Sequence, residues 1–239
     1  MKAFQIFVRK LIHQDKLMPW LMISVVTGIS LLLIRILYTR QLTLSFFLWN
    51  LFLAYIPYLI SASVKNYHKL QKPGLLSVTV VFTWLAFFPN APYILTDFIH
   101  LHQRQHIPYW YDIIIFTLFA WNGLIIGFMS LHDMQQVVSG KFGPKYGWYF
   151  ALTVLLLGSF GVYIGRHLRY NSWDVIMTPY SLAKDMVEIV IYPLRNKSAF
   201  KMTAGMSIFL ITTYYTFKVL INARLTKSSQ SDNPSMNNT

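Results

Sequence analysis

Three short stretches of this sequence hold most of the residue types that could act on a ligand. The first runs from Phe87 to His100 and contains Asn90 and Asp97. Asp97 and His100 are three residues apart, so on a helix they would share a face, where they could transfer protons or hold a divalent metal ion. We therefore treat both as candidate catalytic residues and Asn90 as a candidate substrate-binding residue. The alternative is a proline kink followed by an acid and a histidine at a membrane boundary.

The second stretch is the aromatic run that ends at Asp112. This acid would lie in the first turn of a helix, where the helix dipole favours a negative charge. Asp112 is the third candidate catalytic residue. The neighbouring Trp110 and its flanking tyrosines also fit an aromatic belt at a membrane boundary, which is the simpler interpretation of this stretch.

The third stretch runs from Gly165 to Asp174. Arg166 and Arg169 are three residues apart, and arginine binds carboxylate or phosphate groups through two parallel hydrogen bonds. The pair could therefore hold an anionic group. Together with Asn171 and Asp174 they complete the candidate substrate-binding set. The alternative is a positively charged helix end that faces lipid phosphates.

The composition shows which kind of protein must position these residues. Of 239 residues, 55% are hydrophobic and only 12% are charged, against about 25% charged in soluble proteins. The absence of cysteine excludes disulfides, thiol nucleophiles and Cys-based metal sites. The net charge is +13, but the basic residues lie between long apolar runs. This pattern favours anionic lipid headgroups as partners and not nucleic acid.

Six stretches are each long enough to cross a bilayer, which takes about 20 residues of helix. They are residues 18–38, 42–64, 75–95, 109–131, 147–165 and 202–221. Arg35, Asp112 and Lys218 are the only charged residues within them. The sequence thus predicts an all-α, polytopic membrane helix bundle over 18–222. We expect a cytoplasmic amphipathic segment over 1–17, or else an extension of the first span, and a disordered cytoplasmic tail over 223–239.

The third span is expected to break near its end. Pro89 and Pro92 each remove a backbone donor, so regular helix should fail between about Phe87 and Pro92. A second short helix could then begin with Asn90 as its cap. In the long fifth loop, an amphipathic helix is predicted between Pro179 and Pro193.

Small-residue patterns predict close helix packing at two places. Gly123 and Gly127 form one such pattern, and Gly161 and Gly165 form another. We expect each pair to pack against other helices and not against the other pair.

Lys and Arg counts orient the bundle. They number 12 on the side of the termini and 3 in the first two loops of the other side, although the long fifth loop adds 6 more there. Short loops carry the orientation signal, so we expect both termini in the cytoplasm. All three chemistry-bearing stretches then reach the same outer face. Their acids, the imidazole and the two arginines would converge at one mouth of the bundle.

The sequence resembles a bacterial family of multi-pass membrane proteins, over roughly residues 45–220. The residues that carry the resemblance are Phe87 to His100, Tyr111-Asp112, Trp121-Asn122-Gly123 and Gly165 through Asp174. The family is catalogued as domain of unknown function 1361. The resemblance implies a protein of the bacterial cytoplasmic membrane, and it brings no activity, cofactor or catalytic residue.

Three functions remain open at this point. A scaffold or partner subunit would account for the tail, the packing glycines and the lack of a catalytic motif. An enzyme at the outer face could act on a lipid-linked or envelope substrate, with a divalent metal as one cofactor that its acids could hold. A transporter of small solutes or lipids would use the broken third helix. Nucleotide-binding motifs are absent from the sequence.

Overall fold

A computed structural model describes residues 17–72, 74–102 and 107–231 of the chain. Most of the predicted amphipathic segment over 1–17 and the last residues of the predicted tail therefore lie outside the described residues. Residues 223–231, predicted to be disordered, instead continue the last helix as far as Ser231. This extension contains no glycine or proline and includes good helix formers such as Arg224 and Leu225.

Six helical segments among the described residues are long and apolar enough to cross a membrane, which confirms the predicted fold class. They are Met18–Thr39, Phe46–Asn66, Leu75–His100, Tyr109–Phe142, Pro144–Leu168 and Lys197–Asn222. The first, second and fourth are α2, α3 and α7, and the last belongs to α11, Lys197–Ser231. The chain is thus a multi-pass membrane protein.

The helix α7 is longer than the sequence predicted, continuing to Phe142 instead of ending near residue 131. Hydropathy falls there because polar residues begin at His132. In the structure Asp133 and Gln135 are buried. Asp133 pairs with Lys65 of α3, and the Gln135 side chain accepts hydrogen bonds from Tyr214 and Lys218 of α11. Polar side chains inside a bundle are tolerated where neighbouring helices supply partners.

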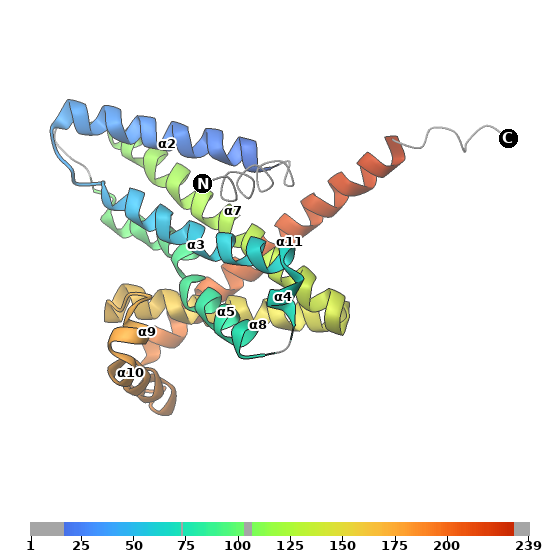
Figure 1. The fold of residues 1–239 in the computed structure, drawn as a ribbon. Coiled ribbons are helices and arrows are strands. Elements are labelled where there is room, and N and C mark those ends of the chain that lie inside the picture. The colour runs from blue at the N-terminus through green and yellow to red at the C-terminus, as the bar shows by residue number, and fades with distance from the viewer. Residues whose placement is uncertain (1–16, 73, 103–106, 232–239) are drawn as a thin grey trace.

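The central helix of the bundle is α7, which packs against α2, α3 and α8 (Figure 1). The helix α8, Pro144–Tyr163, packs in turn against α11. A short helix α4, His68–Gln71, joins α3 to α5 at one end of the bundle. At the other end lie α9, Asp174–Met177, and α10, Pro179–Ile191. The predicted helix of the fifth loop is thus confirmed as α10. We call this second end the Arg166 end.

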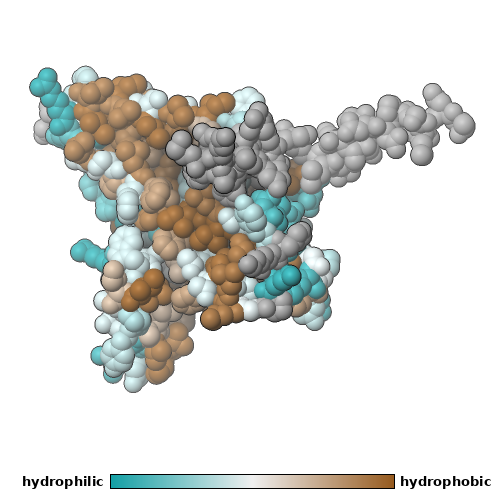
Figure 2. Space-filling model, viewed as in Figure 1, coloured by the Kyte–Doolittle hydropathy of each residue, from teal (hydrophilic) through white to brown (hydrophobic). Residues whose placement is uncertain are grey.

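Large apolar side chains cover much of the outside of the bundle. Trp20, Leu37, Phe82 and Leu156 are among those exposed on the membrane-spanning segments. Figure 2 shows hydrophobic residues over α2 and across the middle of this face, with hydrophilic residues toward its left and right edges. An apolar surface of this extent on spanning helices implies contact with the lipid bilayer.

The predicted break in the third span is confirmed. The helix α5, Leu75–Phe87, is followed by α6, Asn90–Tyr93, and then by the 3-10 helix η1, Ile94–His100. The Ala91 amide donates to Phe88 instead of Phe87. The expected Asn90 cap is wrong, because Asn90 lies inside α6 and makes no cap. Its side-chain amide donates at 2.8 Å to the Phe87 carbonyl, which the break leaves without its usual partner.

Glycines on α7 and α8 allow the broken segment to lie close between these helices. A β-carbon at Gly127 of α7 would lie 2.7 Å from the Ala91 side chain, and one at Gly161 of α8 would lie 2.5 Å from Pro89. Such distances are shorter than carbon contacts allow, so only glycine fits. The two glycine patterns thus pack against the broken segment and not against each other, as the sequence predicted.

Candidate functional site

Arg166 organises the polar centre at its end of the bundle. It lies in the single π-helical turn η2, Ile164–Leu168, which follows α8; such turns often occur at functional sites. From there its side chain reaches the end of the broken span. Its Nε donates to the Thr96 hydroxyl at 2.8 Å, and its guanidinium lies 4.4 Å from the centre of the Tyr93 ring. A cation over an aromatic face is an attractive contact.

Asp97 is the acid of this centre. Its side chain is 2% exposed and forms an ion pair with Arg166. Its second oxygen accepts a hydrogen bond of 2.8 Å from the Asn50 amide of α3. The prediction that a candidate acid would lie within reach of a candidate arginine is confirmed here. Each carboxylate oxygen of Asp97 thus has a hydrogen-bond partner within the bundle.

His100 completes the partners of Arg166. The Nη1 atom of Arg166 lies 3.1 Å from His100 Nε2. A guanidinium group has donors only, so Nε2 must accept and the neutral ring must carry its proton on Nδ1. This leaves His100, an exposed residue, with a second ring nitrogen that can donate a hydrogen bond.

A polar pocket of about 470 Å³ lies beside this centre. Its lining is Tyr93, Ile99, His100, Gly165, Arg166, Arg169 and Asn171. Arg169 is exposed and has a left-handed backbone with φ 62°. It makes no hydrogen bond or ion pair with any residue that the structure describes. The charge of Arg166 is balanced by Asp97, and that of Arg169 is not, so the pocket favours an anion.

An apolar cavity of about 290 Å³ adjoins the polar pocket, sharing Tyr93, Gly165 and Asn171 with it. The apolar lining includes Leu53, Leu85, Leu157, Phe160, Leu182 and Met186. Asn50, Asn90 and Ser172 contribute polar groups. The Asn90 amide donates to the Ser172 hydroxyl at 2.7 Å, which joins the broken span to the loop after η2.

The other two predicted substrate-binding residues have different places. Asn171 lines both cavities. Asp174 instead closes a local turn, because its carboxylate accepts a 2.6 Å hydrogen bond from the Asn171 backbone amide. The structure also places Asn50, Tyr93 and Thr96 in contact with Asp97 or Arg166, and the sequence analysis selected none of these three. Asn50 is an amide within a predicted span, a signal that could have identified it because such amides need partners.

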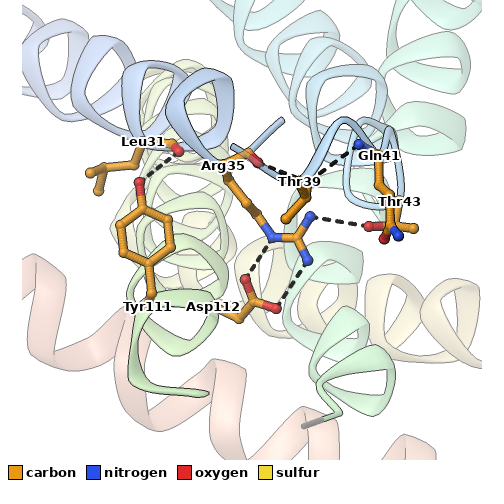
Figure 3. A network of polar contacts seen from close by, with 7 residues as sticks. All are labelled: Leu31, Arg35, Thr39, Gln41, Thr43, Tyr111 and Asp112. Atoms are coloured by element: carbon orange, nitrogen blue, oxygen red, sulfur yellow. Dashed lines mark hydrogen bonds and ion pairs between the residues drawn. The ribbon is translucent and has the colours of Figure 1, made fainter. Parts of the chain in front are cut away.

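Asp112 belongs to a separate polar network (Figure 3). Its carboxylate binds Arg35 of α2 through Nε at 2.7 Å and Nη2 at 3.2 Å. The Arg35 Nη1 atom donates to Thr43 at 3.1 Å, and the Tyr111 hydroxyl donates to the Leu31 carbonyl at 2.9 Å. The prediction that Asp112 would join the Arg166 centre is therefore wrong. Arg35 faces α7 and binds the acid through its Nε and Nη2 atoms. This network ties α2 to α7.

The structure also bears on the divalent metal that the sequence left open. No group of three or more His, Asp or Glu residues suited to a metal ion occurs within residues 17–72, 74–102 and 107–231. Asp97 and His100 lie on either side of the Arg166 guanidinium. A positive group between them disfavours a cation at this position.

Comparison with known proteins gives one match. A family model described as "Protein of unknown function (DUF1361)" matches residues 49–213. No curated protein and no solved structure matches the chain. The matched range contains the whole lining of both cavities, whereas Arg35 lies outside it.

Proposed function

The chain belongs to the DUF1361 family, and because the description of that family assigns no activity, we propose a function from the geometry of the site. We propose that the protein binds a lipid-anchored anionic molecule at the Arg166 end of the bundle. The acidic head, a phosphate or a carboxylate, lies beside Arg169, and the apolar chain enters the neighbouring cavity.

The observation that carries this proposal is the contact between two cavities of opposite character. The polar pocket and the apolar cavity share Tyr93, Gly165 and Asn171 as a common wall. A ligand that fills both must have a polar head joined to an apolar chain, which is the chemistry of a lipid. Sites for small molecules are typically concave and mostly apolar, with a few well-placed polar groups.

The charges support an anionic head. Arg166 is neutralised by Asp97 and fixed by Thr96 and His100. Arg169 has no acid beside it among the described residues, and its fork matches a phosphate or carboxylate. The Nδ1–H group of His100 supplies a further donor at the wall of the same pocket.

The geometry favours binding over acid–base chemistry for two of the three candidate catalytic residues. Asp97 is held by an ion pair and Asp112 is bound to Arg35. Of the three, His100 lines the polar pocket. An enzyme that acts on a lipid-linked substrate would therefore rely on His100 for proton transfer. A scaffold function would need neither cavity. A transporter would use the broken span, but here that span packs closely against glycines of α7 and α8.

We further propose that the Arg166 end faces the outside of a bacterial cytoplasmic membrane, with both termini inside. The support is the excess of Lys and Arg in short loops on the side of the termini. The test is a membrane-impermeant thiol reagent on a Glu188→Cys variant, since the chain has no cysteine of its own. Labelling in intact cells supports this orientation, and labelling only after cell lysis would reverse it.

Binding is tested by the thermal stability of the purified protein with added lipid. A ligand that binds only the folded state raises the free energy of unfolding by RT ln(1 + [L]/Kd), and the unfolding temperature rises with it. We expect phosphatidylglycerol to stabilise the protein more than phosphatidylcholine with the same chains. Arg169→Gln should weaken the phosphatidylglycerol effect about tenfold in apparent affinity, which is about 1.4 kcal/mol and close to the lower end of the range for one hydrogen bond to a charged group.

The matched control is Arg195→Gln. Arg195 is also an exposed arginine at this end of the bundle, but its guanidinium lies over the Tyr192 ring and lines neither cavity. The control should respond to phosphatidylglycerol as the unchanged protein does. Equal loss in both variants would indicate a general surface attraction and would contradict the proposed site.

A further inference from the structure

An apolar face of α10 is covered by no part of the bundle that the structure describes. Tyr180, Val187, Val190 and Ile191 are 81%, 54%, 63% and 60% exposed. Their spacings of three, four and seven residues place them on one side of the helix. They lie outside the six membrane-spanning segments, so the lipid contact of those segments does not by itself account for their exposure.

The other sides of α10 have clear roles. Ile189 is buried and packs with Tyr163 and Ala199, while Leu182 and Met186 line the apolar cavity. The exposed polar residues of α10 are Ser181, Lys184 and Glu188. The helix thus has three faces: one on the bundle, one apolar and free, and one polar and free. Figure 2 shows brown residues beside pale and teal ones in the region of α9 and α10.

The position of α10 in the chain identifies what covers its free apolar face. The spanning segment before it ends at Leu168 and the one after it begins at Lys197. Both ends of the connection therefore start at the membrane boundary. Exposed apolar residues continue from α10 through Leu194 to Phe200 on α11, which is part of the lipid-facing surface. Exposed Lys184 and Lys197 suit anionic headgroups.

We propose that α10 is an interfacial helix seated on an anionic lipid surface. Its apolar face, formed by Tyr180, Val187, Val190 and Ile191, lies at the boundary between headgroups and acyl chains, and its polar face points to water. Amphipathic helices with basic residues beside a wide apolar face bind membranes in this way. This inference stands without the proposed ligand site.

Contact between α10 and the membrane would also affect the apolar cavity, because Leu182 and Met186 of α10 form part of its wall. The Tyr170 hydroxyl donates to Asp185 of α10 at 2.9 Å, which ties the helix to the loop after η2. The hydrogen bond to the Asp185 carboxylate raises the pKa of Tyr170 above its ordinary value. A lipid surface under α10 thus holds one wall of the cavity in place.

The test uses single cysteines, because the chain contains none. Val187→Cys and Ile191→Cys place a fluorescent thiol label on the apolar face. Ser181→Cys and Glu188→Cys place the same label on the polar face as matched controls. Each labelled protein is reconstituted in vesicles of phosphatidylglycerol and phosphatidylcholine, after its unfolding temperature is shown to equal that of the unlabelled protein. Quenching is measured with lipids brominated on their chains and with aqueous iodide.

The expected result is a reversal between the two faces. Labels at 187 and 191 should be quenched several-fold more by brominated lipid than labels at 181 and 188, and less by iodide. Equal access of iodide to all four labels would overturn the proposal. Labels at 187 and 191 shielded from both quenchers would also overturn it, because that result indicates another protein surface, such as a second copy of this chain.

Discussion

At the scale of single residues, two arginine–carboxylate pairs have different roles. Arg166 is surrounded by Asp97, Thr96, His100 and the Tyr93 ring, so its position is fixed beside a pocket. Arg35 is 1% exposed and holds Asp112 away from either cavity. The first pair therefore shapes a binding site, and the second joins α2 to the bundle.

The buried pair of Arg35 and Asp112 gives a test of stability. Arg35→Met leaves the Asp112 charge without its main partner in a site of low dielectric, and we expect a loss of about 3–5 kcal/mol in unfolding free energy. Arg35→Met combined with Asp112→Leu removes both charges and should recover most of that loss. Unfolding of the purified protein in mild detergent measures each value.

The control for this prediction is Lys65→Met. Lys65 also pairs with an acid of α7, Asp133, but its side chain is 41% exposed. Water already solvates the Lys65 ammonium, whereas the Asp133 side chain is 6% exposed, so the loss should be smaller than at Arg35 but larger than for a pair on the surface. Equal losses at the two sites, or no recovery in the double variant, would show that the Arg35 pair does not act as a buried unit.

At the scale of helices, the site depends on a broken segment held between α7 and α8. Two prolines end α5, and the following residues approach both neighbours at glycine positions. This close approach places Tyr93 and Asp97 beside Arg166 at the end of α8. Without the glycines, the segment would stand further out and the arginine would lose its partners.

Glycine substitutions test this packing. A β-carbon in Gly161→Ala would meet Pro89 at 2.5 Å, and overpacking of this kind costs about 1–3 kcal/mol. Gly205→Ala on α11 has no neighbouring atom within 4 Å, so it should stabilise the helix by up to about 1 kcal/mol. Thermal unfolding of both variants gives the comparison. A Gly161→Ala protein as stable as the Gly205→Ala protein would exclude a tight clamp.

At the scale of the whole molecule, the sequence predicted what depends on local composition. Runs of apolar residues identified the six spans, and Pro89 and Pro92 identified the break. The cost of a carboxylate at the membrane boundary predicted that an acid would meet an arginine, and Asp97 does meet Arg166. The continuation of α7 to Phe142 was missed, because Asp133 and Gln135 have partners on other helices and hydropathy cannot show this.

The partner of Asp112, Arg35, could not be predicted from the sequence either. Arg35 and Asp112 are two of the three charged residues within the predicted spans, and they carry opposite charges, which was a usable signal. Their pairing depends on how α2 and α7 rotate toward each other, and local spacing does not fix rotation. The two adjoining cavities likewise arise from segments far apart in the sequence, among them α3, the broken span and α10. No pattern within one segment predicts them.

The central claim is that one amphipathic, anionic lipid occupies both cavities. The most direct measurement is a crystal structure grown in lipid that contains phosphatidylglycerol with brominated chains, with anomalous scattering used to locate bromine. We expect bromine peaks inside the apolar cavity between Leu85 and Met186. The phosphate should lie within about 4 Å of the Arg169 guanidinium, the usual limit for an ion pair. Bromine confined to the outer surface of the bundle, with no phosphate near Arg169, would contradict the claim.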